Sequence, residues 1–162
     1  SKVLLAGDAT VEIWERLNDE ADANALCWNV LLAPHHCSRH SMGRGENEEF
    51  EWSENAIAAL NNPTGTSPHV VCSARKFREG QTPPNPEARN KYYEFLAKGR
   101  TIDAGVTSRL LLTAGKGNSE AADVVFRFKA SGLTRSIAGT GAAAAGEDPA
   151  SAGGGGYGWR RF

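Results

Sequence analysis

Histidines are concentrated in one short stretch of the chain. Three of the four histidines in the 162-residue sequence lie within residues 31–41, together with two serines and a cysteine. This stretch continues an apolar, strand-like segment, and a second such segment, residues 3–7, ends at Asp8. Buried strands that end at polar side chains deliver those groups to one edge of a sheet, where α/β proteins commonly bind ligands. The two patterns together predict a metal site.

A hydrolytic metal centre needs carboxylate oxygens and neutral imidazole nitrogens on rigid elements, and one open coordination position for water. Asp8 is suited to bridge two cations, because one carboxylate offers two oxygens. Either His35 or His36 can supply a nitrogen. Adjacent residues of an extended segment point in opposite directions, so we expect only one of the two to be a ligand. The other is then an outer partner or a substrate contact.

The neighbouring polar residues have several interpretations. Ser38 and Ser41 can hydrogen-bond the histidines or a phosphate, and thereby orient the ligands. His40 can contact substrate or simply face solvent. A histidine pair is more often structural than ligating, and an aspartate after a glycine, such as Asp8, is more often a turn residue or a helix cap. A thiol enzyme built on Cys37 is chemically reasonable, because imidazole can favour the thiolate, but no other residue in the chain supports it.

Hydrophobic periodicity and capping residues predict an α/β fold in the order β-α-β-α-β-α-β-β-β, with a mostly antiparallel end. Thr10, Ser53 and Asn85 are the expected helix N-caps. The expected elements are a strand over 3–7, a helix over 11–23, a strand over 26–32, a helix over 53–60, a strand over 69–73, a helix from 86 that stops at Gly99, and strands over 101–103, 109–113 and 123–129.

Composition narrows the class of protein. Hydrophobic residues make up 40% and charged residues 23% of the chain, which is typical of a single soluble globular domain. The net charge of −1 gives no global attraction for nucleic acid or an anionic membrane. No apolar run approaches the roughly 18 residues of a membrane span, and no signal-peptide pattern is present. Three widely spaced cysteines indicate a reduced, cytoplasmic protein.

Two further segments stand out by composition. Residues 42–51 are polar and acidic, as expected for a loop. The basic start of residues 75–84 makes Arg75, with Lys76 and Arg78, a candidate phosphate contact, although a solvated loop explains it equally well. From residue 131 the chain becomes rich in glycine and alanine, so we expect a folded domain over residues 1–130 and a disordered or docking tail over residues 131–162.

Residues 4–10, the helix after them and residues 30–41 together resemble a known family. They look like the second half of a metallo-β-lactamase-fold hydrolase, closest to the competence-protein (DNA-uptake) branch. Its pattern is a Gly-Asp strand end followed by His-His-Gly-Ser-x-x-Ser. The similarity covers roughly residues 2–130 and is strongest over the first 41. It implies the C-terminal half of an αββα sandwich, with Asp8 as the metal-bridging carboxylate, His36 as the last histidine ligand and His35 as its neighbour in the motif.

The chain departs from the family pattern in three places. Cys37 replaces the usual glycine, which should make the backbone there less permissive. The branch often has Gly-His-Pro where this chain has Asn85 between two prolines, which favours a plain helix cap at that position. The family's His-x-His-x-Asp-His signature and a further histidine, both expected before the Gly-Asp strand, are missing. A complete dinuclear site therefore requires the N-terminal half of the fold, on an upstream segment or on a separate chain.

The resemblance implies a metal-dependent hydrolase, most specifically a phosphodiesterase or nuclease in which two zinc or manganese ions activate a water. Asp8 and His36 are then the catalytic ligands, with His35 beside them. The expected substrate contacts are Ser38, His40, Ser41 and Arg75. The choice of a nucleic acid or other phosphodiester over a β-lactam rests on analogy with the branch alone. The alternative is a non-catalytic interaction module that retains a degenerate half-fold.

Overall fold

A parallel sheet of four strands forms the centre of the molecule. The computed structural model describes residues 1–22, 24–74, 83–113, 122–129 and 132–139. Within them the sheet order is β1 (Val3–Leu5), β2 (Val30–Leu32), β5 (His69–Cys72) and β6 (Leu110–Leu112), and each neighbouring pair is parallel. The α/β class predicted from the sequence is confirmed.

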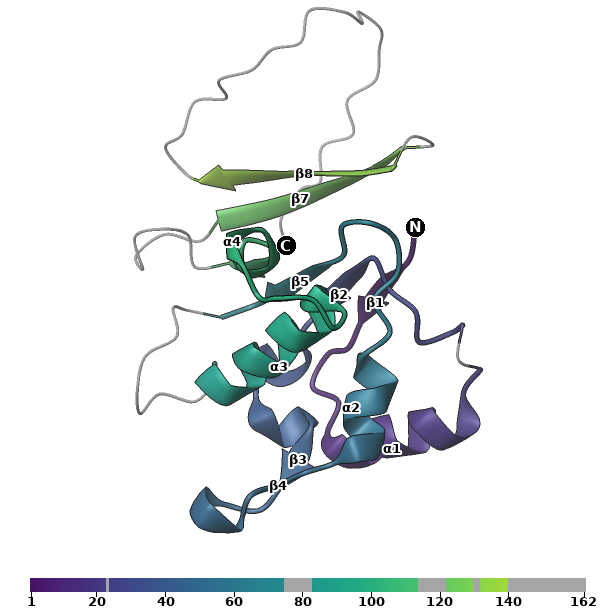
Figure 1. Ribbon diagram of the computed structural model, residues 1–162, viewed down its shortest axis with the longest axis vertical. Coiled ribbons are helices and arrows are strands. Elements are labelled where there is room, and N and C mark those ends of the chain that lie inside the picture. The colour runs from purple at the N-terminus through teal and green to yellow at the C-terminus, as the bar shows by residue number, and fades with distance from the viewer. Residues whose placement is uncertain (23, 75–82, 114–121, 130–131, 140–162) are drawn as a thin grey trace, which may run out of the picture.

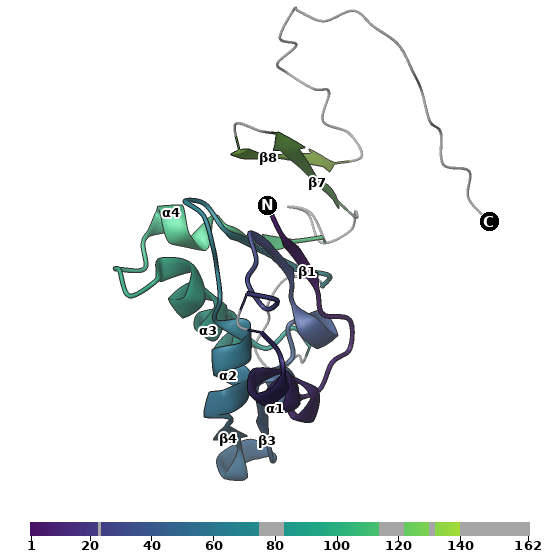
Figure 2. The same ribbon diagram turned by 90° about the vertical axis from the view of Figure 1, so that its right-hand side faces the viewer.

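Three helices cover one face of this sheet (Figures 1 and 2). α1 (Val11–Glu20) connects β1 to β2, α2 (Glu54–Leu60) precedes β5, and α3 (Pro86–Ala97) lies between β5 and β6. The strand order follows the chain order, so every crossover moves in the same direction across the sheet. Crossovers of this kind are almost always right-handed, and this places all three helices on the same side.

The core between helices and sheet is aromatic and fully enclosed. Ser53 and Asn85 cap α2 and α3 with side-chain oxygens, as predicted, whereas Thr10 is the N-cap residue of α1 without a side-chain cap bond. The largest completely buried side chains in this layer are Trp14, Trp28, Tyr92, Phe95, Leu31, Met42 and Leu60.

A hairpin packs on the other face of the sheet (Figure 2). Its strands β7 (Ala122–Lys129) and β8 (Gly132–Gly139) are antiparallel. Val124 and Phe126, which alternate with exposed neighbours, pack against the small core cluster of Val30, Val71 and Leu111. The half-exposed strand predicted over 123–129 is confirmed.

β8 corrects the predicted start of the tail. The change of composition at residue 131 does not end the folded region, because residues 132–139 are paired along their length with β7. Glycine and alanine enrichment signals weak side-chain packing, but it leaves the backbone donors and acceptors of a strand intact. The remainder of the predicted tail, residues 140–162, lies outside the described residues.

No described residue covers β1 on the hairpin side. It is the edge strand of the sheet, and its side chains Val3 and Leu5 are 47% and 73% exposed. The register pairs them with Val30 and Leu32, so they belong to the same face as the residues beneath the hairpin. Parallel sheets normally have both faces buried. The uncovered strand is therefore a place where further polypeptide can pack.

Several predicted elements differ from those observed. Residues 101–103 form no strand, because the Asp103 carboxylate accepts the N–H of Val106 (2.8 Å) and caps α4 (Ala104–Thr107) instead. The strand expected over 26–32 begins only at Val30. The expected loop 42–51 contains a short hairpin, β3 (Gly43–Arg44) and β4 (Glu51–Trp52). The end of the chain is less antiparallel than predicted, since β6 is parallel to β5.

The shortened second strand has a local cause. Trp28 forms only an isolated bridge with Pro63, and its backbone N–H donates to Asn62 rather than to a strand of the sheet. Asn62 and Pro63, which follow α2, therefore pair with Trp28 in place of a strand of the sheet. In the part of the chain that the structure describes, the helices are too short and too polar to cross a membrane.

Candidate functional site

The carboxyl ends of β1, β2 and β5 meet at one edge of the sheet. Asp8 follows β1, His35 and His36 follow β2, and Ser73 follows β5. The backbone N–H of His35 donates to the carbonyl of Gly7 (2.9 Å), which ties the two turns together. The structure thus brings the predicted aspartate turn and the predicted histidine turn side by side.

A tight turn presents Asp8 to solvent. The N–H of Ala9 donates to the carbonyl of Ala6 (3.2 Å), and Gly7 between them has φ +55°. Asp8 is a turn residue, as one interpretation held, but it does not cap α1, because the N-cap position belongs to Thr10. Among the described residues the Asp8 carboxylate, which is exposed, has no hydrogen-bond or ion-pair partner. Its oxygens are available to a cation.

The left-handed backbone of Gly7 gives a prediction. An added Cβ at Gly7 meets no atom within 4 Å, so Gly7→Ala changes only the backbone preference. We expect the free energy of unfolding to fall by about 1–2 kcal/mol, the cost of a left-handed residue with a Cβ. Urea denaturation measures this change, and Gly7→Asn should lose less because asparagine tolerates this conformation better. Identical midpoints for wild type and Gly7→Ala would contradict the turn geometry.

A backbone hydrogen bond fixes the orientation of the His36 ring. Its Nδ1 lies 2.7 Å from the carbonyl oxygen of Ser73. A carbonyl oxygen only accepts, so Nδ1 carries the hydrogen, and in the neutral ring Nε2 keeps a free lone pair. Metal-ligating histidines typically have this arrangement, with the second ring nitrogen donating to a carbonyl or carboxylate.

The histidine turn is left-handed rather than extended. His35, His36 and Cys37 have φ values of 46°, 56° and 68°. We expected the two rings to point in opposite directions because we assumed an extended backbone. That assumption is wrong. Both rings are exposed, with centroids 6.3 Å apart and planes inclined by 57°. Each left-handed residue costs about 1–2 kcal/mol, and such strain tends to collect at functional sites.

Cys37 has a strained backbone and lies beneath the rim, which is the sheet edge formed by the Asp8 turn and the turn of His35 and His36. Its side chain is completely buried and hydrogen-bonds the thiol of Cys72, also buried. This hydrogen bond, followed by burial, raises the pKa of Cys72 well above its ordinary value. Cys37 faces the core, whereas Asp8 and His36 are exposed. The placement argues against Cys37 as a metal ligand or nucleophile.

Asn85, the N-cap residue of α3, also contacts the histidine turn. The backbone N–H of Asn85 donates to the carbonyl of Cys37 (2.9 Å). Its side-chain oxygen accepts the N–H groups of Glu87 (2.8 Å) and Ala88 (3.0 Å), so the predicted helix cap is confirmed. The histidine turn is thus fixed to β1, β5 and α3.

The predicted substrate contacts are not all placed to reach a substrate. The Ser41 side chain is completely buried, which corrects its assignment as a direct contact, and Ser38 is buried with its hydroxyl accepting the N–H of His40 (3.2 Å). Ser38 therefore shapes the turn, whereas the buried Ser41 hydroxyl has no hydrogen-bond partner among the described residues. His40 is half-exposed, with Nε2 3.8 Å from Glu46 Oε1. Arg75, like Lys76 and Arg78, lies outside the described residues.

His40 borders a hollow that is also lined by Arg44, which forms an ion pair with α1. The hollow has a volume of about 280 Å³ and is also lined by Thr10, Glu12, Arg44 and Glu46. Arg44 donates to both carboxylate oxygens of Glu15 (3.0 and 2.6 Å), and this pairing with α1 lowers the pKa of Glu15. Of the predicted substrate residues that the structure describes, which are Ser38, His40 and Ser41, His40 is the most exposed.

The rim carries an incomplete set of donors. Asp8 supplies carboxylate oxygens and the two histidines supply imidazole nitrogens, which are ligand types that zinc accepts. Within the described ranges, however, no three His, Cys, Asp or Glu side chains are grouped closely enough to hold a metal ion. The sequence did not identify the Ser73 carbonyl as the partner of His36. The one indication in the sequence is that the strand over 69–73 ends at Ser73.

No protein-family model, curated protein or solved structure matches this chain.

Proposed function

We propose that this chain is the C-terminal half of a metallo-β-lactamase-like, metal-dependent hydrolase that cleaves phosphodiesters, such as nucleic acid. The observation that carries the proposal is the hydrogen bond from His36 Nδ1 to the Ser73 carbonyl (2.7 Å). It orients the ring with Nε2 as the available donor atom, next to the turn that presents Asp8. The distinction between a phosphodiester and a β-lactam substrate comes from the family resemblance.

The residues of the rim have separate roles in this proposal. Two zinc or manganese ions, when bound, supply Lewis-acid stabilisation of the phosphate and activation of a water. Asp8 and His36 would hold these ions, Asp8 through its carboxylate oxygens and His36 through Nε2, and His35 would be a further ligand or a substrate contact. His40 is proposed as a substrate contact, which its position in the lining of the hollow supports.

The remaining ligands come from a further polypeptide, either an upstream segment of the same protein or a separate chain. The uncovered face of β1 supports this part of the proposal, because Val3 and Leu5 expose apolar side chains on a parallel sheet that otherwise has both faces covered. Burying them gives the second half of the fold a reason to associate.

Metal analysis tests the proposal. The protein is purified with the polypeptide encoded upstream of Ser1, or with any chain that copurifies, and its metal content is measured. We expect stoichiometric zinc or manganese, and a loss of metal affinity of at least about 100-fold in His36→Ala, since removal of an outer partner alone costs about 10–100-fold. Asp8→Asn should lose metal similarly. Asp19→Asn, an exposed aspartate on α1, is the matched control and should retain it.

The second candidate is an interaction module without catalysis. It is favoured by the lack of a three-donor group within the described residues. If the assembled wild-type protein contains no metal, or if Asp8→Asn and Asp19→Asn retain metal equally, the hydrolase proposal fails and the module is the better account.

A further inference from the structure

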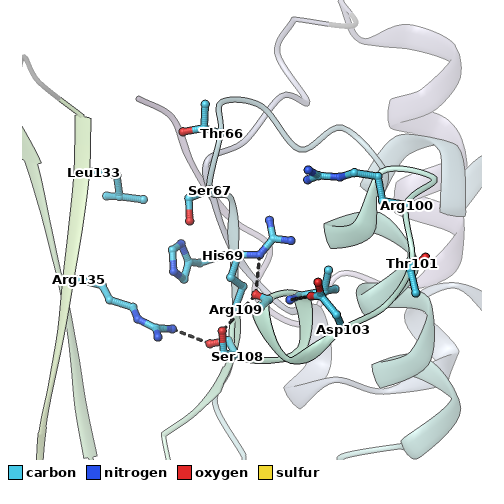
Figure 3. Close-up of a pocket in the computed structure, with 12 residues that line it drawn as sticks. Thr66, Ser67, His69, Arg100, Thr101, Asp103, Ser108, Arg109, Leu133 and Arg135 are labelled. Carbon is cyan, nitrogen blue, oxygen red and sulfur yellow. Dashed lines mark hydrogen bonds between the residues drawn. The ribbon is translucent and has the colours of Figure 1, made fainter.

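A cavity of about 560 Å³ opens at the end of the sheet opposite the histidine turn. His69 begins β5, whereas Ser73 lies after its other end, so this cavity and the Asp8 rim are separated by the length of the strand. Figure 3 shows the cavity between the hairpin strand β8 on one side and α4 on the other. Its volume lies within the range of about 300–1,000 Å³ that small-molecule sites occupy.

The lining of the cavity is strongly cationic. Arg100, Arg109 and Arg135 all contribute, against the single carboxylate of Asp103. Their side chains are anchored by uncharged backbone carbonyls: Arg109 Nη2 donates to Leu96 (2.9 Å) and Arg135 Nη1 to Ser108 (2.6 Å). Within the described ranges none of the three guanidinium groups has a carboxylate within 4 Å. The positive charge is oriented but not neutralised.

His69 lines this cavity with a largely buried ring. Its side chain is only 7% exposed, and Nδ1 has no hydrogen-bond partner in the described part of the chain. The ring lies edge-on to Phe126, at a centroid distance of 5.5 Å, and Figure 3 shows it between Arg135 and Arg109. The cavity therefore offers a ligand an imidazole ring that is held between two guanidinium groups.

The remaining lining suits a tetrahedral anion. Hydroxyl groups of Thr66, Ser67 and Thr101 also line the cavity, and hydroxyls and guanidinium groups both donate to phosphate oxygens. Leu133 adds a small apolar wall on the hairpin side. The combination resembles neither a metal site, which needs anionic or neutral donors, nor an apolar ligand pocket.

We propose that this cavity is a binding site for the phosphate group of a small phosphorylated molecule, held by Arg100, Arg109 and Arg135 with a hydrogen bond to His69. The proposal is independent of the hydrolase proposal, because it uses none of the residues of the Asp8 rim. The bound species can be inorganic phosphate itself or a nucleotide that presents its phosphate to the same groups.

Isothermal titration of the protein, kept in EDTA so that no metal competes, tests the site. Inorganic phosphate and adenosine monophosphate are the probes, and we expect one saturable site. Arg135→Gln or Arg100→Gln should weaken binding by about 10-fold or more, since each removes a charge-assisted hydrogen bond. Tighter binding of the nucleotide identifies a phosphorylated small molecule, and equal binding identifies the free anion.

Arg127→Gln is the matched control for these variants. Arg127 lies on the same hairpin, on β7, but it alternates with the inward-facing Phe126 and does not line the cavity, whereas Arg135 is paired with Phe126. It should bind both probes like wild type. The proposal is overturned if neither probe binds, if the double variant Arg100→Gln/Arg135→Gln binds normally, or if Arg127→Gln loses as much affinity as Arg135→Gln.

The titration of His69 gives a second readout. Burial, then Arg135 and Arg109, lower the pKa of His69 and outweigh a backbone hydrogen bond at Ser67 that raises it. The other charged groups of the lining are Arg100 and Asp103, and the Phe126 ring on β7 is uncharged. A bound anion offsets the positive charge, so sulfate, which does not titrate in this range, should raise the pKa of His69 in NMR. An unchanged pKa at saturating sulfate would place the anion elsewhere.

Discussion

We expect Asp8→Asn and His36→Ala each to lower kcat/KM for a phosphodiester by about three powers of ten in the proposed metal-loaded, assembled protein. The proposed metal site supplies several kcal/mol of transition-state stabilisation, and each 1.36 kcal/mol is worth about tenfold in rate. Asparagine cannot supply the bridging charge of Asp8, and alanine removes the nitrogen that the Ser73 carbonyl orients. Steady-state hydrolysis of a chromogenic phosphodiester by the metal-loaded protein measures the effect.

Two comparisons separate this effect from a loss of folding. Asp19→Asn should keep the wild-type rate, and the urea midpoints of Asp8→Asn and His36→Ala should lie close to that of wild type, because both side chains are exposed. The proposed roles are wrong if either variant retains more than about a tenth of the wild-type rate, a loss of less than 1.4 kcal/mol.

The largest effect on stability is expected at Trp28. Its side chain is completely buried in the helix-face core, and its Nε1–H donates to the carbonyl of Leu60 (2.8 Å). We expect Trp28→Ala to lower the free energy of unfolding by about 3–5 kcal/mol, since it leaves a large cavity in a packed core. The free energy of unfolding of a native domain is only about 5–15 kcal/mol in total. Chemical denaturation monitored by circular dichroism measures the change.

Trp28→Phe distinguishes the cavity from the hydrogen bond. Phenylalanine keeps most of the apolar volume but removes the donor. The Leu60 carbonyl also accepts the N–H of Asn62 (2.9 Å), so it is not left unsatisfied. We therefore expect Trp28→Phe to cost only about 1–2 kcal/mol. A cost as large as that of Trp28→Ala would contradict the view that packing dominates at this position.

The sequence predicts best what is determined locally. The caps at Ser53 and Asn85 follow from side chains that bond N–H groups two or three residues ahead, and the structure confirms both. The parallel strands 3–5 and 30–32 follow from apolar runs joined by a helix. Because parallel strands end at the same edge, the adjacency of Asp8 and the histidine turn could be inferred without coordinates.

Features that depend on distant packing could not be predicted. The left-handed backbone of residues 35–37 is held by contacts to Gly7 and Asn85, and no local propensity indicates it. The cationic cavity is lined by both His69 and Arg135, and Arg135 lies on β8. This strand lies in a glycine- and alanine-rich stretch that we expected to be a tail. Residues 101–103 have strand-like composition, but the Asp103 cap of α4 overrides it.

Long-range proton–nitrogen NMR of the His36 ring tests the central claim most directly. We predict that the ring of the metal-free protein is the Nδ1–H tautomer, bonded to the Ser73 carbonyl, and that zinc added to the assembled protein shifts the Nε2 resonance. Asp8→Asn should weaken that shift. An Nε2–H tautomer, or an Nε2 resonance that stays unchanged at saturating zinc, would contradict the account of this rim as half of a metal site.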